Sequence, residues 1–160
     1  MSRFIYIKIP RIKDKVKIKI FSDLIHCWAN ALCSCKGKIS FNTQMLKTER
    51  DYQIVVVAHE LGHRRAFKKN ITTNQSIDGR LVWEEALADY YALQKCGIKR
   101  LNKMYDYDLI SYKTIKHRKK EYAECVRETT NRCKLVLKWR YKKLTYTQAF
   151  NKCREFWPRR

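Results

Sequence analysis

The residues with the clearest chemical potential lie in the segment H-E-L-G-H, which contains His59, Glu60 and His63. In a helix the two histidines are one turn apart and share a face, so both imidazoles can bind one Zn²⁺ while Glu60 sits beside the water that it would deprotonate. This is the layout of a zinc hydrolase. A catalytic zinc ion has three protein ligands and keeps its fourth position for water, so the sequence should supply one more ligand.

A second helix is predicted over residues 81–92, which contain good helix formers and few helix breakers and follow an Asp-Gly turn signal. Glu85 and Asp89 are four residues apart and therefore share a face of this helix. Glu85 is the candidate third zinc ligand, and Asp89 is placed to accept the second ring N–H of a ligand histidine. Glu84 points about 100° away from them.

The chain resembles the gluzincin metallopeptidases, whose second helix carries a glutamate ligand followed four residues later by an aspartate. The residues that carry this resemblance are His59, Glu60, His63, Glu85 and Asp89. The resemblance covers residues 37–96, and the small size is similar to that of minigluzincins and of small phage or mobile-element metallopeptidases. It implies that His59, His63 and Glu85 bind zinc, that Glu60 is the general base, and that Asp89 orients His59. It also implies an α+β, zincin-like fold and a peptide or protein substrate.

Other assignments of the site residues stay open or rank lower. A third histidine ligand would have to be His117, far downstream in a very basic segment, and it ranks well below Glu85. By the same resemblance, a tyrosine or histidine downstream of the third ligand stabilises the oxyanion, and the spacing does not choose among the candidates Tyr105, Tyr107, Tyr112 and His117. A second metal site would combine Cys27, Cys33 and Cys35 with Cys125 or Cys133, but these spacings are not those of zinc ribbons, and cysteine is commonly a small buried hydrophobe.

The elements before the motif are predicted from periodicity. Residues 4–9 and 16–20 alternate apolar and basic side chains, as half-buried strands do, and are expected to form an antiparallel pair. Ser22 is a good N-cap for a helix that passes through Leu32 and stops near Gly37. Residues 38–42 are predicted to be a short strand, and by resemblance residues 37–42 are the candidate edge strand for an extended substrate.

The elements after the motif are predicted to be helical. Residues 68–80 are polar and turn-rich and are expected to form a loop between the two metal-binding helices, and Gly97 ends the second of them. A long helical region that allows for one break is expected from about residue 111 to residue 143, with one face formed by Tyr122, Cys125, Val126, Thr129 and Cys133. Thr145 then caps a final short helix that carries Ala149, Phe150, Cys153 and Trp157 and is ended by Pro158.

Length and composition favour one globular domain. A chain of 160 residues with 45% hydrophobic residues can bury one core. We expect a single zincin-like domain, with strands and a scaffold helix in residues 1–50, metal-binding helices in residues 51–97 and a basic helical region in residues 98–160. The seven cysteines are an odd number for a closed disulfide framework, and the N-terminus lacks the pattern of a signal peptide. Together with the lack of a membrane-spanning apolar run, this predicts a protein of the reducing cytoplasm.

The formal charge of +21 is the strongest anomaly of composition, and residues 98–160 contain 19 basic and six acidic side chains. Such a charge attracts nucleic acid or another polyanion, with a strong dependence on salt. Lys113 to Lys120 and Lys134 to Lys143, with Trp139 and Tyr141 among them, suit phosphates and stacked bases; a solvated helix face is the simpler interpretation. The alternative function is therefore a basic nucleic-acid-binding or regulatory protein on a zincin-like fold, with little protease activity.

Overall fold

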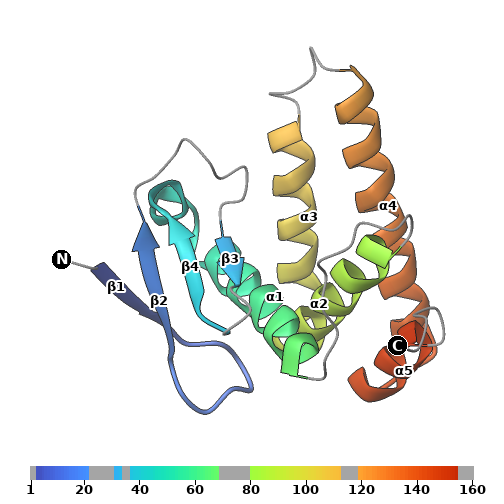
Figure 1. Cartoon of the computed structure of the whole chain (residues 1–160), viewed down its shortest axis with the longest axis horizontal. Helices are drawn as coiled ribbons and strands as arrows, with labels where there is room; N and C mark the ends of the chain where they lie inside the picture. The colour runs from blue at the N-terminus through green and yellow to red at the C-terminus, as the bar shows by residue number, and fades with distance from the viewer. Residues whose placement is uncertain (1–2, 22–30, 34–36, 69–79, 113–118, 155–160) are drawn as a thin grey trace.

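The computed structural model describes residues 3–21, 31–33, 37–68, 80–112 and 119–154. Within these residues the chain forms one four-stranded sheet, a short 3₁₀ helix and five α-helices, so the prediction of a mixed α+β fold is confirmed. The elements in chain order are β1 (Arg3–Ile7), β2 (Val16–Phe21), β3 (Ala31–Cys33), β4 (Ile39–Asn42), η1 (Thr43–Lys47), α1 (Arg50–Lys68), α2 (Arg80–Cys96), α3 (Ile98–Tyr112), α4 (Lys119–Tyr141) and α5 (Tyr146–Arg154) (Figure 1).

The sheet has the strand order β1-β2-β4-β3. β1 pairs with β2 antiparallel, as predicted, whereas β2 and β4 are parallel and β3 and β4 are antiparallel. Alternation along β2 buries Val16, Ile18 and Ile20 and exposes the lysines between them, because successive side chains of a strand point to opposite faces. The buried side chains pack into one hydrophobic cluster with residues of all five α-helices.

Two predictions about this region are wrong. The helix predicted to pass through Leu32 is not present there, because Ala31–Cys33 pairs with β4 as a strand; residues 22–30 of that prediction lie outside the described residues. Residues 37–42 do not provide an edge strand, since β4 lies between β2 and β3. Long-range pairing decides both outcomes, and local periodicity does not report it.

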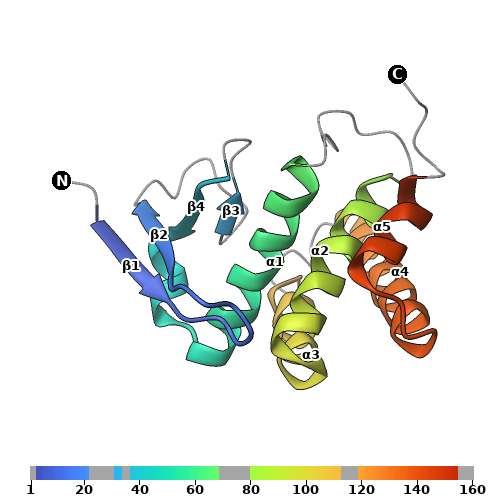
Figure 2. The ribbon, with the colours of Figure 1, turned by 90° about the horizontal axis from the view of Figure 1, so that it is seen from below.

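The helices lie in succession beside the sheet. Figure 2 shows α1 next to β3, α2 on the other side of α1, and then α4 and α5, with α3 packed below α1 and α2. α2 ends at Cys96, where Gly97 takes the predicted left-handed conformation with φ +85°. The structure describes no helix that is long and apolar enough to cross a membrane.

The C-terminal helices differ in part from the prediction. The helical region predicted from about residue 111 comprises the end of α3, which extends through Ser111 to Tyr112, and α4, which begins at Lys119; residues 113–118 lie outside the described residues. The predicted face of α4 is confirmed: its members are half-buried and Thr129 is buried. Thr145 caps α5 as predicted, since its hydroxyl accepts the backbone N–H of Gln148 and its own N–H donates to the Gln148 side chain. Of the loop predicted at residues 68–80, Lys68 ends α1, Arg80 begins α2, and residues 69–79 lie outside the described residues, as do Trp157 and Pro158.

α1 and α2 approach each other closely at Gly62, directly before His63. A Cβ atom at Gly62 would lie 2.7 Å from the Cα of Ala88 and 3.0 Å from its carbonyl oxygen, both of which are backbone atoms. Gly to Ala inside a helix normally stabilises by about 1 kcal/mol. We expect Gly62→Ala to destabilise instead, by about 2 kcal/mol, because the two helices must separate.

The change in the free energy of unfolding is measured by denaturant titration. Asn102→Ala, at an exposed position of α3, is the matched control that reports helix propensity alone. A Gly62→Ala protein at least as stable as wild type would contradict this close approach of the two helices.

Candidate metal centre

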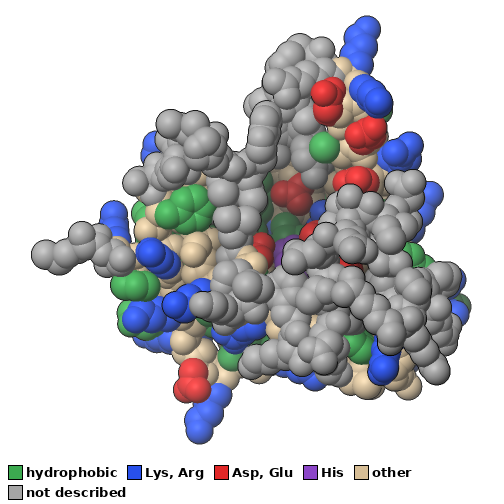
Figure 3. Space-filling view, viewed as in Figure 1, with side chains coloured by type: hydrophobic (Ala, Val, Ile, Leu, Met, Phe, Trp, Pro, Cys, Tyr) green, Lys and Arg blue, Asp and Glu red, His purple; other side chains and the backbone are tan. Residues whose placement is uncertain are grey.

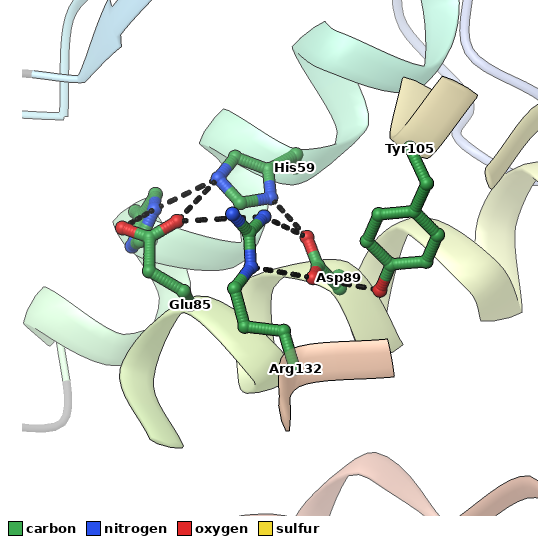
Figure 4. Close-up of polar contacts among 6 residues, drawn as sticks. His59, Glu85, Asp89, Tyr105 and Arg132 are labelled. Atoms are coloured by element: carbon green, nitrogen blue, oxygen red, sulfur yellow. Dashed lines mark hydrogen bonds and ion pairs between the residues drawn. The ribbon is translucent and has the colours of Figure 1, made fainter. Parts of the chain in front are cut away.

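Three candidate ligands from two helices converge. His59 and His63 come from α1 and Glu85 from α2, and their ligand atoms all lie within 4.8 Å of one another. The two Nε2 atoms are 3.0 Å apart, and the Glu85 carboxylate oxygens lie 3.1 Å from His59 Nε2 and 3.3 Å from His63 Nε2 (Figure 4). This group could hold a metal ion. In Figure 3 histidine and acidic side chains are visible together in a hollow near the middle of the face shown.

Asp89, one turn after Glu85, fixes the orientation of His59. Its side chain is fully buried, and its Oδ1 lies 2.8 Å from His59 Nδ1. Burial acts to raise the pKa of Asp89, but Arg132 and His59 outweigh it and hold this pKa below its ordinary value. An ionised carboxylate only accepts hydrogen bonds, so Nδ1 of His59 carries the proton and donates it. In the neutral ring, the lone pair of His59 is therefore on Nε2, which faces the other two ligands.

Arg132 of α4 and Tyr105 of α3 complete the surroundings of Asp89. Arg132 donates from Nε to Oδ2 at 3.0 Å and from Nη2 to Oδ1 at 2.9 Å, and the Tyr105 hydroxyl donates to Oδ2 at 2.8 Å. Arg132 Nη2 also lies 3.8 Å from Glu85 Oε2. Asp89 thus connects α1, α3 and α4 beside the candidate ligands (Figure 4).

Sequence reasoning did not identify Arg132 as part of the site. One signal was present: Arg132 is three residues after Thr129 and four before Val136, so a charged residue shares the face of the helix that buries both. A charge on a buried helix face needs a partner, and the partner here is 43 residues away in the sequence.

Glu60 is buried, with 8% of its surface exposed, next to the histidine pair. Burial raises the pKa of its carboxyl above the ordinary value, while His59 and His63 act in the opposite direction. A carboxyl with a raised pKa is a stronger base than an exposed one, which suits a group that takes a proton from water and later returns it.

Asp108 of α3 is a second group that sequence reasoning missed. It is half-buried, and burial raises its pKa to about 6, with smaller effects from Arg132 and Asp89. It lies on the face of α3 that buries Leu101, Met104 and Tyr105, because the spacing is that of one helix face. The charges that act on Asp108 are those of the candidate metal centre, so Asp108 belongs to the same electrostatic environment.

Of the four candidates for oxyanion stabilisation, Tyr105 is committed to Asp89 and is 7% exposed. Tyr107 is 37% exposed and its ring packs 4.1 Å from that of Tyr52, measured between centroids. The side chain of Tyr112 and all of His117 lie outside the described residues. The structure therefore disfavours Tyr105 and does not choose an oxyanion donor.

The structure also bears on two further sites that the sequence suggested, a cysteine metal site and a nucleic-acid-binding segment. Among the described residues, the group that could hold a metal is His59, His63 and Glu85, and no described cysteine belongs to it; Cys27 and Cys35 lie outside the described residues. The suggestion that Trp139 stacks on bases is wrong, because only 2% of its surface is exposed and its ring packs against Trp83 and Tyr90. Tyr141, in contrast, is 89% exposed.

Comparison of the chain with protein families, curated proteins and solved structures finds no significant match. The chemistry of the site therefore has to be argued from its own geometry. That geometry consists of three converging ligand atoms, a buried carboxyl beside them and an ionised aspartate that orients one of the ligands.

Proposed function

We propose that this chain is a zinc-dependent metallopeptidase with a zincin-like fold, in which Glu60 is the general base. The observation that carries the proposal is the convergence of two imidazole nitrogens and one carboxylate oxygen with a buried glutamate next to them in the same helix. Two histidines and a glutamate are the ligand set of one major class of catalytic zinc sites, and the fourth position is left for water. A purely structural metal site would not need Glu60.

The choice of metal rests on the neighbouring groups. Two histidines and a carboxylate also bind non-haem Fe(II), so the ligands alone do not select zinc. Zinc is favoured because Glu60 supplies a base for hydrolysis, which oxygen chemistry at iron does not require. Asp89 supports either metal, because its hydrogen bond to Nδ1 leaves Nε2 of His59 free for coordination.

In the proposed mechanism a bound zinc ion would polarise the peptide carbonyl and lower the pKa of its water to about 7. Glu60 takes the proton from this water as it attacks the carbonyl, and then passes the proton to the leaving amine. Asp89 keeps the His59 ring in one tautomer and orientation throughout, and Arg132 keeps Asp89 ionised. In this mechanism Glu60 carries the proton, whereas Asp89 and Arg132 hold His59 in place.

The substrate is proposed to bind as an extended chain along β3. β3 is at one edge of the sheet, on the side of α1, and pairs with β4. α1, which carries Glu60 and two of the ligands, packs against β3. A peptide added to this edge would gain backbone hydrogen bonds and run past the metal centre.

The test combines metal content and hydrolysis in one set of samples. Wild-type protein purified without chelators is expected to contain one zinc per chain and to cleave an unfolded protein. Glu85→Ala removes one of three ligands, so zinc affinity should fall by at least 100-fold, and cleavage should fall with it. Metal content is measured by atomic emission, and cleavage by mass spectrometry of the products.

Glu84→Gln is the matched control, because Glu84 is the adjacent glutamate in α2, is buried and is not one of the converging ligands. This variant should keep both zinc and cleavage. Iron in place of zinc would overturn the peptidase proposal, and zinc without cleavage would favour the alternative of a regulatory protein on a zincin-like fold. Zinc that is unaffected by Glu85→Ala would overturn the ligand assignment.

A further inference from the structure

Two aromatic rings and two lysines share the face of β1 and β2 that points away from the core. Phe4 is 43% exposed and Tyr6 is 55% exposed. In the antiparallel register Phe4 lies opposite Lys19, and Tyr6 lies opposite Lys17. These four residues, which we call the outer sheet face, alternate with the buried residues of the two strands.

Both exposed rings lie on β1, at one edge of the sheet. β1 is an edge strand, and edge strands are usually protected from aggregation by charged side chains, so two exposed aromatic residues there are a liability. The ammonium group of Lys17 lies 4.2 Å from the centroid of the Phe4 ring, which is a cation–π distance. Neither Lys17 nor Lys19 forms an ion pair with another residue that the structure describes, and Lys17 lies over the Phe4 ring, so a ligand would meet this charge and this ring together.

The surrounding charge is strongly positive. Residues 1–21 contain seven lysines and arginines and a single acidic residue, Asp14. Figure 3 shows hydrophobic and basic side chains side by side over β1 and β2, at the left of the view. A ligand that suits this surface must offer flat rings together with negative charge, which is the chemistry of an unpaired nucleotide.

We propose that the outer sheet face binds single-stranded nucleic acid, with bases stacked on Phe4 and Tyr6 and phosphates held by Lys17 and Lys19. Residues two apart in a strand are separated by about 6.7 Å, roughly twice the 3.4 Å rise between stacked bases of one strand. The two rings therefore accept bases of an extended strand. A duplex keeps its bases stacked on each other and offers the rings no free base face.

This surface is separate from the metal centre. β1 and β2 are the two strands farthest from α1, as Figure 2 shows, and the metal ligands lie on α1 and α2. Binding should therefore persist in the Glu85→Ala protein and in the presence of a chelator. The nucleic-acid proposal would therefore stand if the peptidase proposal failed, and the peptidase proposal would stand if the nucleic-acid proposal failed.

The test is fluorescence anisotropy of a labelled 20-nucleotide oligo(dT), titrated with the whole chain at several salt concentrations. Phe4→Thr and Tyr6→Thr keep the tendency to form a strand and remove the rings, and each is expected to weaken binding about tenfold. Lys17→Ser with Lys19→Ser is expected to reduce the slope of log K against log salt by about 1.4, since each phosphate contact to a single strand contributes about 0.7. Unfolding midpoints confirm that each variant is folded.

The controls are exposed residues outside the two basic segments: Ile110 is 60% exposed, and Lys99 and Lys152 are exposed as well. Ile110→Ala should leave the affinity unchanged, and Lys99→Ser with Lys152→Ser should leave the salt slope unchanged. Equal losses of affinity in the variants of the outer sheet face and in the control variants would mean that binding follows net charge alone, and would overturn the proposal. So would equally tight binding of a 20-base-pair duplex, or binding only to vesicles of anionic lipid.

Discussion

Replacing Glu60 with glutamine is expected to abolish peptide hydrolysis and to leave zinc bound. Glutamine has the shape of glutamate but cannot take a proton from water, so the reaction loses its general base. The expected loss in rate is about 10²- to 10⁴-fold. Zinc content should stay at one per chain, because the metal ligands are His59, His63 and Glu85 in the proposed site.

The stability of this variant separates catalysis from folding. Burial raises the pKa of Glu60, which means that its charged form is disfavoured where it sits. A neutral amide there should leave the free energy of unfolding unchanged or increase it, as is common when a residue kept for activity is replaced. Loss of cleavage in a protein that is no less stable would assign the defect to chemistry.

Glu128→Gln is the matched control for Glu60→Gln, because it makes the same change at an exposed position of α4. Its rate of cleavage should equal that of the wild type when both are followed with the same unfolded substrate. Full activity in the Glu60→Gln protein would remove Glu60 from the mechanism, and with it the reason for preferring zinc hydrolysis over iron chemistry.

The parts of the site that the sequence could predict are those determined by helical spacing. His59 and His63 are one turn apart, as are Glu85 and Asp89, and the structure brings both pairs together because each pair occupies one face of its helix. To assemble the candidate site, the fold adds to these helical spacings only the packing of α1 on α2. Gly62 allows that close packing.

The parts that could not be predicted depend on contacts between distant segments. Ala31–Cys33 is a strand because it pairs with β4, although its apolar spacing also suits a helix. β4 is internal because β2 and β3 pair with it on opposite sides, and no local pattern in these segments specifies the strand order. Arg132 is one of many basic residues in α4, and only the fold reveals that it is the one that contacts Asp89.

Replacing Arg132 with methionine is expected to have the largest effect on stability. Arg132 makes two hydrogen bonds to a carboxylate that is fully buried, so its removal leaves a buried charge without its main counter-charge. Breaking a buried pair in this way costs about 3 to 5 kcal/mol. Zinc affinity should also fall, by about 10- to 100-fold, because Asp89 would no longer be held in place to orient His59.

A double-mutant cycle with Asp89→Asn tests whether the two residues act as a pair. Asparagine can still accept the hydrogen bond from His59 and carries no charge, so it removes the need for Arg132. The double variant should be more stable than the sum of the single losses predicts, by about 1 to 3 kcal/mol. Unfolding is measured by denaturant titration in excess chelator, which removes the contribution of bound metal.

The conservative variant and an exposed control make this test specific to the geometry. Arg132→Lys keeps the charge but cannot donate from two positions in a plane to one carboxylate, so it should recover only part of the stability and of the zinc affinity. Lys134→Met changes the same charge at an exposed position two residues later and should cost less than about 0.5 kcal/mol. Strictly additive losses in the cycle would show that Arg132 and Asp89 contribute independently, and α4 would then have no energetic part in holding the metal centre.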